Sequence, residues 1–279
     1  MYVFKHASDL QHYLAKARNE GKSIGFVPTM GALHAGHIEL ITAARDNTDV
    51  VVCSIFVNPT QFNDPKDFEK YPVTIEQDME KLVNAGNHVL FLPSVAEMYP
   101  EGLAGGLHYD FGYLETLLEG AYRPGHFQGV GRIVHKLLNL VNPDKLFMGQ
   151  KDFQQCMIVK RLLDITHLPV ELVICPTRRE TDGLAMSSRN VRLNPGERAG
   201  ATLIYKVLNY IKSQRSAPDY SSVIAEATTQ LEAGGFVPDY VAIASADTLK
   251  PEHKASGAPL VALIAAKLGD VRLIDNIVY

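Results

Sequence analysis

The chain has 279 residues, of which 46% are hydrophobic and 21% are charged, a composition that indicates a folded globular protein and excludes a largely disordered one. Its 27 basic and 31 acidic side chains give a formal net charge of −4 at pH 7, so no overall positive field favours nucleic acid or an anionic membrane. The length is sufficient for one large or two ordinary domains.

The sequence shows no signs of membrane insertion or secretion. The longest apolar runs, 50–57 and 259–266, are far shorter than the roughly 20 residues of a membrane-spanning helix. The first residues lack a charged segment followed by an apolar stretch, so we expect no signal peptide and a cytoplasmic protein. Cys53, Cys156 and Cys175 are widely spaced in apolar runs, and we expect reduced core thiols, with no zinc site and no disulfide framework.

In chain order, the first part of the sequence alternates predicted helices and strands. Apolar residues at helical spacing predict a helix between Ser8 and Gly21, and apolar runs predict strands at 24–27, where Pro28 ends the run, and at 50–57. The further predicted elements are helices at about 38–47, 75–82, 127–141 and 150–165 and strands at 88–92, 145–148 and 170–175. This alternation predicts an α/β domain with a parallel sheet and right-handed crossovers over residues 1–176.

After Cys175 the predicted order changes to helices followed by strands. Asn194 and Pro195 place an N-cap before a proline at the first helical position, which predicts a helix to about Gln214. The elements predicted next are a second helix that ends at Gly234 and short strands at 240–244, 260–267 and 271–274. We therefore predict a smaller α+β domain over residues 177–279.

The junction at residues 28–37 joins a predicted strand to a predicted helix and carries two histidines. His34 and His37 are three residues apart, so they share a face on a first helical turn. A helix N-terminus exposes unpaired N–H groups and a positive dipole end, which favour phosphate, and Gly31 and Gly36 allow the backbone to approach a ligand. The chain has no Walker A sequence and no G-x-G-x-x-G, so this junction is the predicted phosphate cradle. Taken alone, it is equally compatible with a loop that carries two surface histidines.

Polar clusters follow several predicted strands directly. They lie at 29–37, 58–62 and 149–155, and a fourth cluster at 177–189 follows the last strand of the first domain. In an open parallel sheet, ligands bind outside the carboxyl ends of the strands. We therefore expect these clusters at one edge of the sheet.

Motifs far apart in the chain resemble those of one enzyme family. H-A-G-H at 34–37 and M-S-S-R at 186–189 resemble the HIGH and KMSKS pair of the nucleotidyltransferase superfamily. More narrowly, essentially the whole chain resembles the pantoate–β-alanine ligase family, and the stretches that carry this resemblance are 28–34, 57–62, 123–127, 149–155 and 182–190. The departures are Gln150, where the family usually has Glu, and Phe147–Met148; neither is a position on which the chemistry depends.

The resemblance implies a Rossmann-like domain at 1–176 that binds ATP and pantoate, and an α+β lid domain at 177–279. It implies a two-step reaction in which the pantoate carboxylate attacks the α-phosphate of Mg-ATP, giving pantoyl adenylate and diphosphate. The amine of β-alanine then attacks the activated carbonyl and releases pantothenate and AMP. The implied cofactor is Mg²⁺, which needs only one or two protein carboxylates, and the implied assembly is a homodimer.

The resemblance also implies the site residues. The predicted catalytic residues, which supply donors and cations for attack on phosphorus, are His34, His37, Lys151, Ser187, Ser188 and Arg189. The predicted ATP-binding residues are these six together with Met30, Gly31, Gly149, Asp152 and Met186. The predicted pantoate-binding residues are Gln61, Gln155, Met30, Phe62 and Asn58. Asp78 is the predicted Mg²⁺ ligand, Arg123 and His126 are expected to order the pocket wall, and no general base is evident for the β-alanine step.

Three other interpretations use the same motifs. A nucleotidylyltransferase that keeps AMP in its product would need basic residues for a substrate phosphate and would not need Gln61 and Gln155. The charge of −4 and the lack of a basic appended domain disfavour a class I aminoacyl-tRNA synthetase. A non-catalytic nucleotide-binding protein would be expected to have lost part of the histidine, lysine and arginine set, which is intact here.

Overall fold

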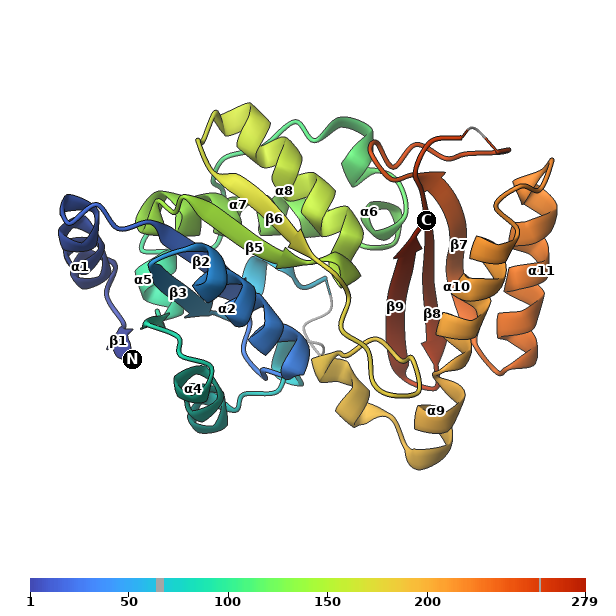
Figure 1. Cartoon of the computed structure of the whole chain (residues 1–279), viewed down its shortest axis with the longest axis horizontal. Coiled ribbons are helices and arrows are strands. Elements are labelled where there is room, and N and C mark those ends of the chain that lie inside the picture. The colour runs from blue at the N-terminus through green and yellow to red at the C-terminus, as the bar shows by residue number, and fades with distance from the viewer. Residues whose placement is uncertain (64–67, 256) are drawn as a thin grey trace. The chain divides into compact units, whose positions relative to one another are not determined.

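The computed structural model describes residues 1–63, 68–255 and 257–279 (Figure 1). These residues group into two compact units. The first unit comprises Met1–Gly149 and Ile158–Pro176, and the second comprises Gln150–Met157 and Thr177–Tyr279. The border between Pro176 and Thr177 is the one at which the sequence places its two domains, whereas the short segment Gln150–Met157 groups with the second unit.

A six-stranded sheet forms the centre of the first unit, as the alternation of strands and helices predicts. Its strands lie in the order β1-β4-β3-β2-β5-β6, and the neighbouring pairs are parallel. Every residue of β3 is buried, as expected for a central strand covered on both faces. The strands are β1 (Tyr2–Phe4), β2 (Ile24–Thr29), β3 (Val50–Ile55), β4 (Val89–Phe91), β5 (Lys145–Gly149) and β6 (Glu171–Cys175).

The direction in which strands are added to this sheet switches beside β2. The chain adds β3 and β4 on one side of β2, and it then adds β5 and β6 on the other side. Ligands of open parallel sheets bind at the carboxyl ends of the strands that flank such a switch point. These ends are Thr29 in β2 and Gly149 in β5. The histidine junction and the 149–155 segment therefore follow the two strands at which a ligand is expected.

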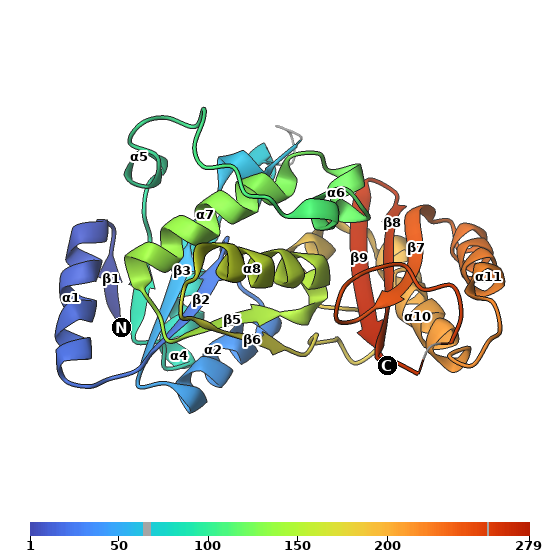
Figure 2. The same ribbon diagram turned by 90° about the horizontal axis from the view of Figure 1, so that it is seen from above.

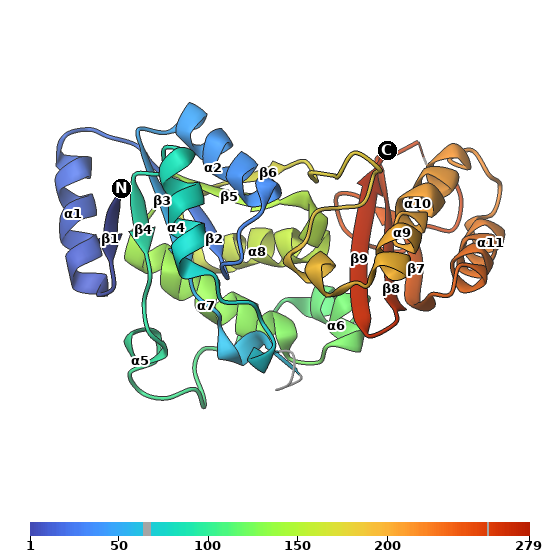
Figure 3. The ribbon, with the colours of Figure 1, turned by 90° about the horizontal axis from the view of Figure 1, so that it is seen from below.

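Helices cover both faces of the parallel sheet (Figures 2 and 3). On one face, α2 (Ala35–Asn47) packs on β2, β3 and β5 and contacts α4 (Ile75–Asn84), with Leu40, Ile41 and Leu82 in the core between them. On the other face, α7 (His126–Val141) packs on β2 and contacts α1 (Ala7–Asn19). Shorter helices are α5 (Val95–Met98) and α6 (Glu119–Tyr122), and α8 (Phe153–Thr166) contributes residues to both units.

A three-stranded antiparallel sheet and two long helices make up most of the second unit, which confirms the predicted α+β class. The strands are β7 (Val237–Ser245), β8 (Leu260–Leu268) and β9 (Val271–Val278), in that order. They pack against α10 (Leu203–Ser213) and α11 (Tyr220–Ala233). The core between these layers is apolar, and it includes Leu208, Tyr220 and Ile264. Two buried polar residues, Asp275 and Asn276, interrupt the apolar sequence of β9.

Several local predictions are wrong in detail; the central strand predicted at 50–57, for example, ends at Ile55. The sequence predicts that Pro28 ends the first central strand, but β2 continues to Thr29 with Pro28 in register with Ser54. β2 pairs with β5 before Pro28, at Gly25 and Phe26. The edge of β2 that faces β5 therefore needs no backbone N–H at position 28, and proline is tolerated there. The single helix predicted from 194 to 214 is instead divided into α9 (Pro195–Gly200) and α10, since Gly200 is a weak helix former.

The cysteine side chains are largely buried, as their place in apolar runs predicts. The three cysteines are free; Cys53 and Cys156 are buried, and Cys175 is partly buried. Burial raises the pKa of the Cys53 thiol to about 12, so this thiol stays protonated at neutral pH. Across the described ranges, no helix is long and apolar enough to cross a bilayer.

Candidate active site

The predicted histidine pair lies at the start of α2, directly after β2. His34 is the N-cap of α2, and its Nδ1 accepts a hydrogen bond from the backbone N–H of Gly36 at 3.2 Å. Nδ1 of His37 accepts one from the backbone N–H of His34 at 3.3 Å. The ring centroids are 4.1 Å apart. The two rings therefore lie side by side, as their three-residue spacing predicts, and together they cap the helix.

The carboxylate of Asp78 holds the loop that precedes the histidines. Gly31 and Ala32 have positive φ angles of 84° and 49°, and such a conformation is costly for alanine. Oδ2 of Asp78 accepts the backbone N–H of Ala32 at 2.9 Å, and Oδ1 accepts that of Leu33 at 2.8 Å. The hydroxyl of Thr74 donates to Oδ2 at 3.1 Å. Asp78 belongs to α4 and is fully buried, and its hydrogen bonds stabilise the loop in this strained conformation.

Lys81 supports the same loop from one turn further along α4, where its Nζ donates to the carbonyl oxygen of Leu33 at 2.7 Å. The sequence predicts Asp78 as a Mg²⁺ ligand, yet its two oxygens already accept three hydrogen bonds. This geometry favours a positioning role. Within the described ranges, no cluster of three or more His, Cys, Asp or Glu side chains forms a candidate metal site.

Asn58 and Gln61 lie together in the turn that follows β3. This turn is a short 3-10 helix over Pro59–Gln61, and Asn58 is its N-cap. Asn58 Nδ2 donates to Gln61 Oε1 at 3.1 Å, and Gln61 Nε2 contacts the sulfur of Met30 at 3.1 Å. Both amide side chains are buried. Three of the residues predicted to bind pantoate thus form one continuous set of contacts.

Phe62 directly follows this turn. Its ring packs edge-on against the rings of Phe68 and Tyr71, with centroid distances of 5.3 and 5.9 Å. These contacts place Phe62 in a small aromatic cluster of the first unit. Its role against the methyl groups of pantoate stays a prediction.

Arg123 and His126 hold the main chain of Gln61. Nδ1 of His126 donates to the carbonyl oxygen of Gln61 at 2.8 Å, and the Arg123 guanidinium donates to Nε2 of His126 at 3.2 Å. These two bonds fit a neutral imidazole that carries its proton on Nδ1. Arg123 also lies 3.8 Å from the buried carboxylate of Glu119. Both residues are therefore placed to position Gln61.

Two further residues, neither of them predicted from the sequence, shape this region. The hydroxyl of Tyr99 donates to Asn58 Oδ1 at 2.7 Å, and burial raises the pKa of Tyr99, which keeps this donor protonated. Gly129 of α7 lies against the turn, where a Cβ would stand 2.3 Å from the carbonyl oxygen of Thr60. The sequence offers one signal for Gly129, since a glycine inside a helical pattern indicates close packing.

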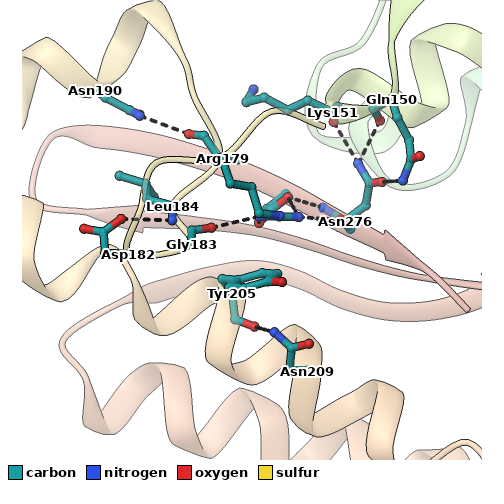
Figure 4. Close-up of polar contacts among 12 residues, drawn as sticks. Gln150, Lys151, Arg179, Asp182, Gly183, Leu184, Asn190, Tyr205, Asn209 and Asn276 are labelled. Carbon is teal, nitrogen blue, oxygen red and sulfur yellow. Dashed lines mark hydrogen bonds and ion pairs between the residues drawn. The ribbon is translucent and has the colours of Figure 1, made fainter. Parts of the chain in front are cut away.

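In the second unit, Lys151 and Asp152 belong to the 3-10 turn Gln150–Asp152 that leads into α8. Lys151 Nζ and Asp152 Oδ1 are 4.0 Å apart, and the two side chains are 18% and 52% exposed. Nδ2 of Asn276 donates to the carbonyl oxygens of Gln150 and Lys151 at 3.0 and 2.9 Å (Figure 4). Gln155 lies in the first turn of α8 and is partly exposed.

The predicted motif at 186–189 begins with the last residue of a tight loop, 178–186. Backbone hydrogen bonds and a β-bridge join the two ends of this loop. Nη1 of Arg179 donates to the carbonyl oxygen of Gly183 in this loop at 3.1 Å (Figure 4). Ser187 then caps a 3-10 turn, and its Oγ accepts the backbone N–H of Arg189 at 3.3 Å. The motif residues are partly exposed on a loop that its own hydrogen bonds hold.

Comparisons of the sequence with known proteins all indicate one family. The family model described as pantoate-beta-alanine ligase matches residues 2–278. The pantothenate synthetase of Pseudomonas fluorescens (strain Pf0-1) is 48% identical over 279 residues, which cover 99% of this chain and 97% of the relative. The pantothenate synthetase of Hahella chejuensis is 46% identical, with 99% and 98% of the two chains covered.

Solved structures give the same result. The crystal structure of pantothenate synthetase from Thermus thermophilus matches with a TM-score of 0.91 and 40% identity over 99% of both chains. Pantoate-beta-alanine ligase from Francisella tularensis, crystallised in complex with beta-gamma ATP and beta-alanine, matches with a TM-score of 0.81 and 36% identity, covering 99% of this chain and 97% of that one. The chain belongs to the pantoate–β-alanine ligase family.

Proposed function

We propose that the chain condenses (R)-pantoate with β-alanine at the expense of ATP and forms pantothenate, AMP and diphosphate through a pantoyl adenylate. One observation carries this proposal: a histidine pair caps α2 at the switch point of the parallel sheet, in a chain that the family model matches from residue 2 to residue 278. The complex of the Francisella tularensis relative with beta-gamma ATP and beta-alanine supports two of the three substrates.

The histidine pair supplies donors for the phosphates. Nδ1 accepts a hydrogen bond in both His34 and His37, so a neutral ring carries its proton on Nε2, on the other side of the ring. Attack of the pantoate carboxylate on the α-phosphorus increases the negative charge on the non-bridging oxygens. Donors that are already in place stabilise this charge without reorganising. The positive end of the α2 dipole acts in the same direction.

The proposed cations of the reaction are Lys151 and Arg189. In the proposed reaction, Lys151 and Arg189 neutralise phosphate charge, Ser187 and Ser188 donate hydroxyl hydrogen bonds, and Asp152 accepts from a ribose hydroxyl. Arginine suits this role because its planar guanidinium binds phosphate with two parallel hydrogen bonds. Gly31, Gly149, Met30 and Met186 are proposed to border the nucleotide. These roles rest on the family motifs. They are supported by the hydrogen bonds that hold the backbone of Lys151 and of Arg189 in place.

The pantoate site is proposed to include Gln61, Gln155 and Asn58 for its polar groups, with Met30 and Phe62 against its methyl groups. An amide side chain both donates and accepts, which suits a substrate that carries two hydroxyl groups and a carboxylate. Gln61 Nε2 lies 3.1 Å from the sulfur of Met30, and a thioether is a weak acceptor. A substrate oxygen can replace this contact at little cost, so Gln61 is well placed to bind pantoate.

Mg²⁺ is proposed to arrive with ATP, held mainly by phosphate oxygens and water. When bound, it polarises the phosphates and offsets their charge. Asp78 fits poorly as a direct ligand, because it is fully buried and both of its oxygens accept loop hydrogen bonds. Asp78 is therefore proposed to support the histidine loop.

Three further features are proposed from the family resemblance alone. In the second step, proximity of the β-alanine amine to the adenylate is proposed to suffice without a dedicated base. The chain is proposed to work as a homodimer in the cytoplasm. The lid role of residues 177–279, which would exclude water from the adenylate, stays a prediction.

Product analysis tests the proposed function. The purified chain is incubated with ATP, Mg²⁺, pantoate and β-alanine, and nucleotides and pantothenate are separated by chromatography. We expect AMP and pantothenate in equal amounts when all substrates are present, and almost no AMP when either pantoate or β-alanine is left out. In a parallel incubation with a phosphorylated cofactor precursor in place of pantoate and β-alanine, diphosphate release without AMP would instead identify a nucleotidylyltransferase.

A further inference from the structure

Asp275 and Asn276 are polar residues in the largely apolar strand β9, and they are only 4% and 1% exposed. Their partners in register on β8 are Ile264 and Leu263. Burying a carboxylate and an amide among such residues costs free energy unless their polar atoms are paired. An aliphatic pair would complete the sheet without this cost, so the contacts of the two side chains need a separate explanation.

Asp275 holds the loop that leads into the 186–189 motif. Its carboxylate accepts two hydrogen bonds from the guanidinium of Arg179, at 2.5 and 3.0 Å. The same guanidinium donates to the carbonyl oxygens of Gly183 and Asn276 and lies over the ring of Tyr205, 4.1 Å from its centroid (Figure 4). Four hydrogen bonds and one ring contact thus hold Arg179, and with it the turn from which the motif emerges.

Asn276 holds the turn that carries Lys151. Nδ2 donates to the carbonyl oxygens of Gln150 and Lys151, and Oδ1 accepts from Nε2 of Gln150 at 3.2 Å (Figure 4). The nitrogen and the oxygen of the amide therefore both bond to the short segment Gln150–Lys151. An aspartate of the same shape would keep the acceptor and lose both donors, and an alanine would lose all three bonds.

We propose that Asp275 and Asn276 are positioning residues for adenylate formation, which hold Lys151 and the 186–189 motif in a fixed relation to each other. The two segments are separate in sequence, and they are tied to consecutive residues of one strand. This inference rests on the proposed function, in which both segments bind the phosphates of ATP. A displacement of about 1 Å in such a group is enough to lower a rate by about 100-fold.

The first test compares Asn276→Ala with Asn209→Ala. Asn209 lies in the same unit and donates from its side chain to a backbone carbonyl, that of Tyr205, at 2.8 Å, but it is exposed. In pantoate-dependent exchange of diphosphate into ATP, we expect Asn276→Ala to lower kcat by about 10- to 100-fold and to change the KM for ATP by less than about threefold. Asn209→Ala should leave both values within about twofold of wild type.

The second test is a double-mutant cycle with Lys151→Ala. If Asn276 acts through Lys151, the Lys151→Ala/Asn276→Ala enzyme should lose little more activity than Lys151→Ala alone. A loss in the double variant that equals the product of the two single losses would overturn the inference for this residue. The assay is run at high enzyme concentration so that the slow variants are measurable.

A matched pair tests Asp275. Asp239 and Asp275 lie in the same sheet, and each pairs with an arginine: Asp239 Oδ2 accepts from Arg272 Nε at 2.6 Å. Asp275→Asn and Asp239→Asn therefore each remove one such carboxylate. We expect a fall in kcat of at least tenfold for Asp275→Asn and a change of less than threefold for Asp239→Asn. Equal effects of the two variants on kcat would show that Asp275 serves stability alone.

Folding is monitored by thermal melting, and assays are run well below each midpoint. If Asn276→Ala does not fold, Asn276→Asp replaces it, because its side chain has the same shape. An exchange rate in Asn276→Asp equal to that of wild type would then overturn the inference. Failure of wild-type exchange would reject the proposed function itself, whereas normal wild-type exchange with unaffected variants would reject only this inference.

Discussion

The carboxylate of Asp78 accepts the backbone N–H of Leu33 at 2.8 Å, although 45 positions separate the two residues in the chain. The same side chain accepts the N–H of Ala32, whose φ is positive. One buried residue of α4 thus sets the conformation of the loop that leads into His34. The histidine motif therefore depends on a carboxylate that its own local sequence does not contain.

Asp78→Asn tests this dependence. The amide keeps the shape but places a donor where an acceptor is needed, so we expect a loss of about 2 kcal/mol in the free energy of unfolding and a fall in kcat. Chemical denaturation and steady-state kinetics measure the two effects. If Asp78 were instead a metal ligand, the variant would keep its stability and need a much higher Mg²⁺ concentration for half-maximal rate.

His34 has two separable roles, as a helix cap and as a phosphate donor. His34→Asn keeps an N-cap acceptor for the backbone N–H of Gly36 and removes the imidazole, whereas His34→Ala removes both. We expect both variants to lose about 100-fold or more in kcat, and only His34→Ala to lose about 1 kcal/mol of stability. An active His34→Asn enzyme would contradict a role of the ring in catalysis.

Gly129 permits the close approach of α7 to the turn that carries Asn58 and Gln61. A Cβ at this position would lie 2.3 Å from the carbonyl oxygen of Thr60 and 2.8 Å from Cα of Gln61, so the backbone must move. We expect Gly129→Ala to raise the KM for pantoate by about tenfold and to destabilise the fold by about 1–3 kcal/mol. Gly200→Ala is the control, because its Cβ would meet an ordinary contact at 3.8 Å. Equal KM values in the two variants would contradict this assignment.

Stability should fall at mildly acidic pH because of His135. The hydroxyl of Tyr109 bonds Nδ1 of this ring at 2.6 Å, and burial lowers the pKa of His135 from 6.5. The unfolded chain then binds the proton more tightly than the folded chain. The contribution of His135 is therefore complete above about pH 6.5 and is lost as the pH falls below that value. Urea unfolding between pH 5 and 8 should show a smaller decline in His135→Gln than in wild type, and identical declines would reject this origin.

Local spacing was sufficient to predict much of the fold. The apolar runs of β2 and β3 and the interval between His34 and His37 depend on residues close together in sequence. The structure has strands at both runs, although their ends differ from the predicted ones, and it has the two rings side by side. Pro28 shows the limit of this approach. Whether proline ends a strand depends on which neighbours pair with it, and this is a property of the sheet as a whole.

The supporting residues of the site were harder to predict for the same reason. Asp78, Gly129 and Asn276 act on segments that are distant in sequence, through hydrogen bonds or close packing that only the folded chain creates. Their residue types are ordinary at their positions, as a carboxylate on a helix or an amide in a strand. Family motifs identify the groups proposed to touch ATP, and the structure adds the residues that hold them.

The central claim is that the chain activates the carboxylate of pantoate by adenylation before β-alanine takes part. The most direct measurement is the incorporation of labelled diphosphate into ATP, with Mg²⁺ and pantoate present and β-alanine absent. We predict rapid exchange that requires pantoate and is lost by orders of magnitude in Lys151→Ala, with its melting temperature nearly unchanged. Absence of exchange in folded wild-type protein that binds ATP would contradict the account.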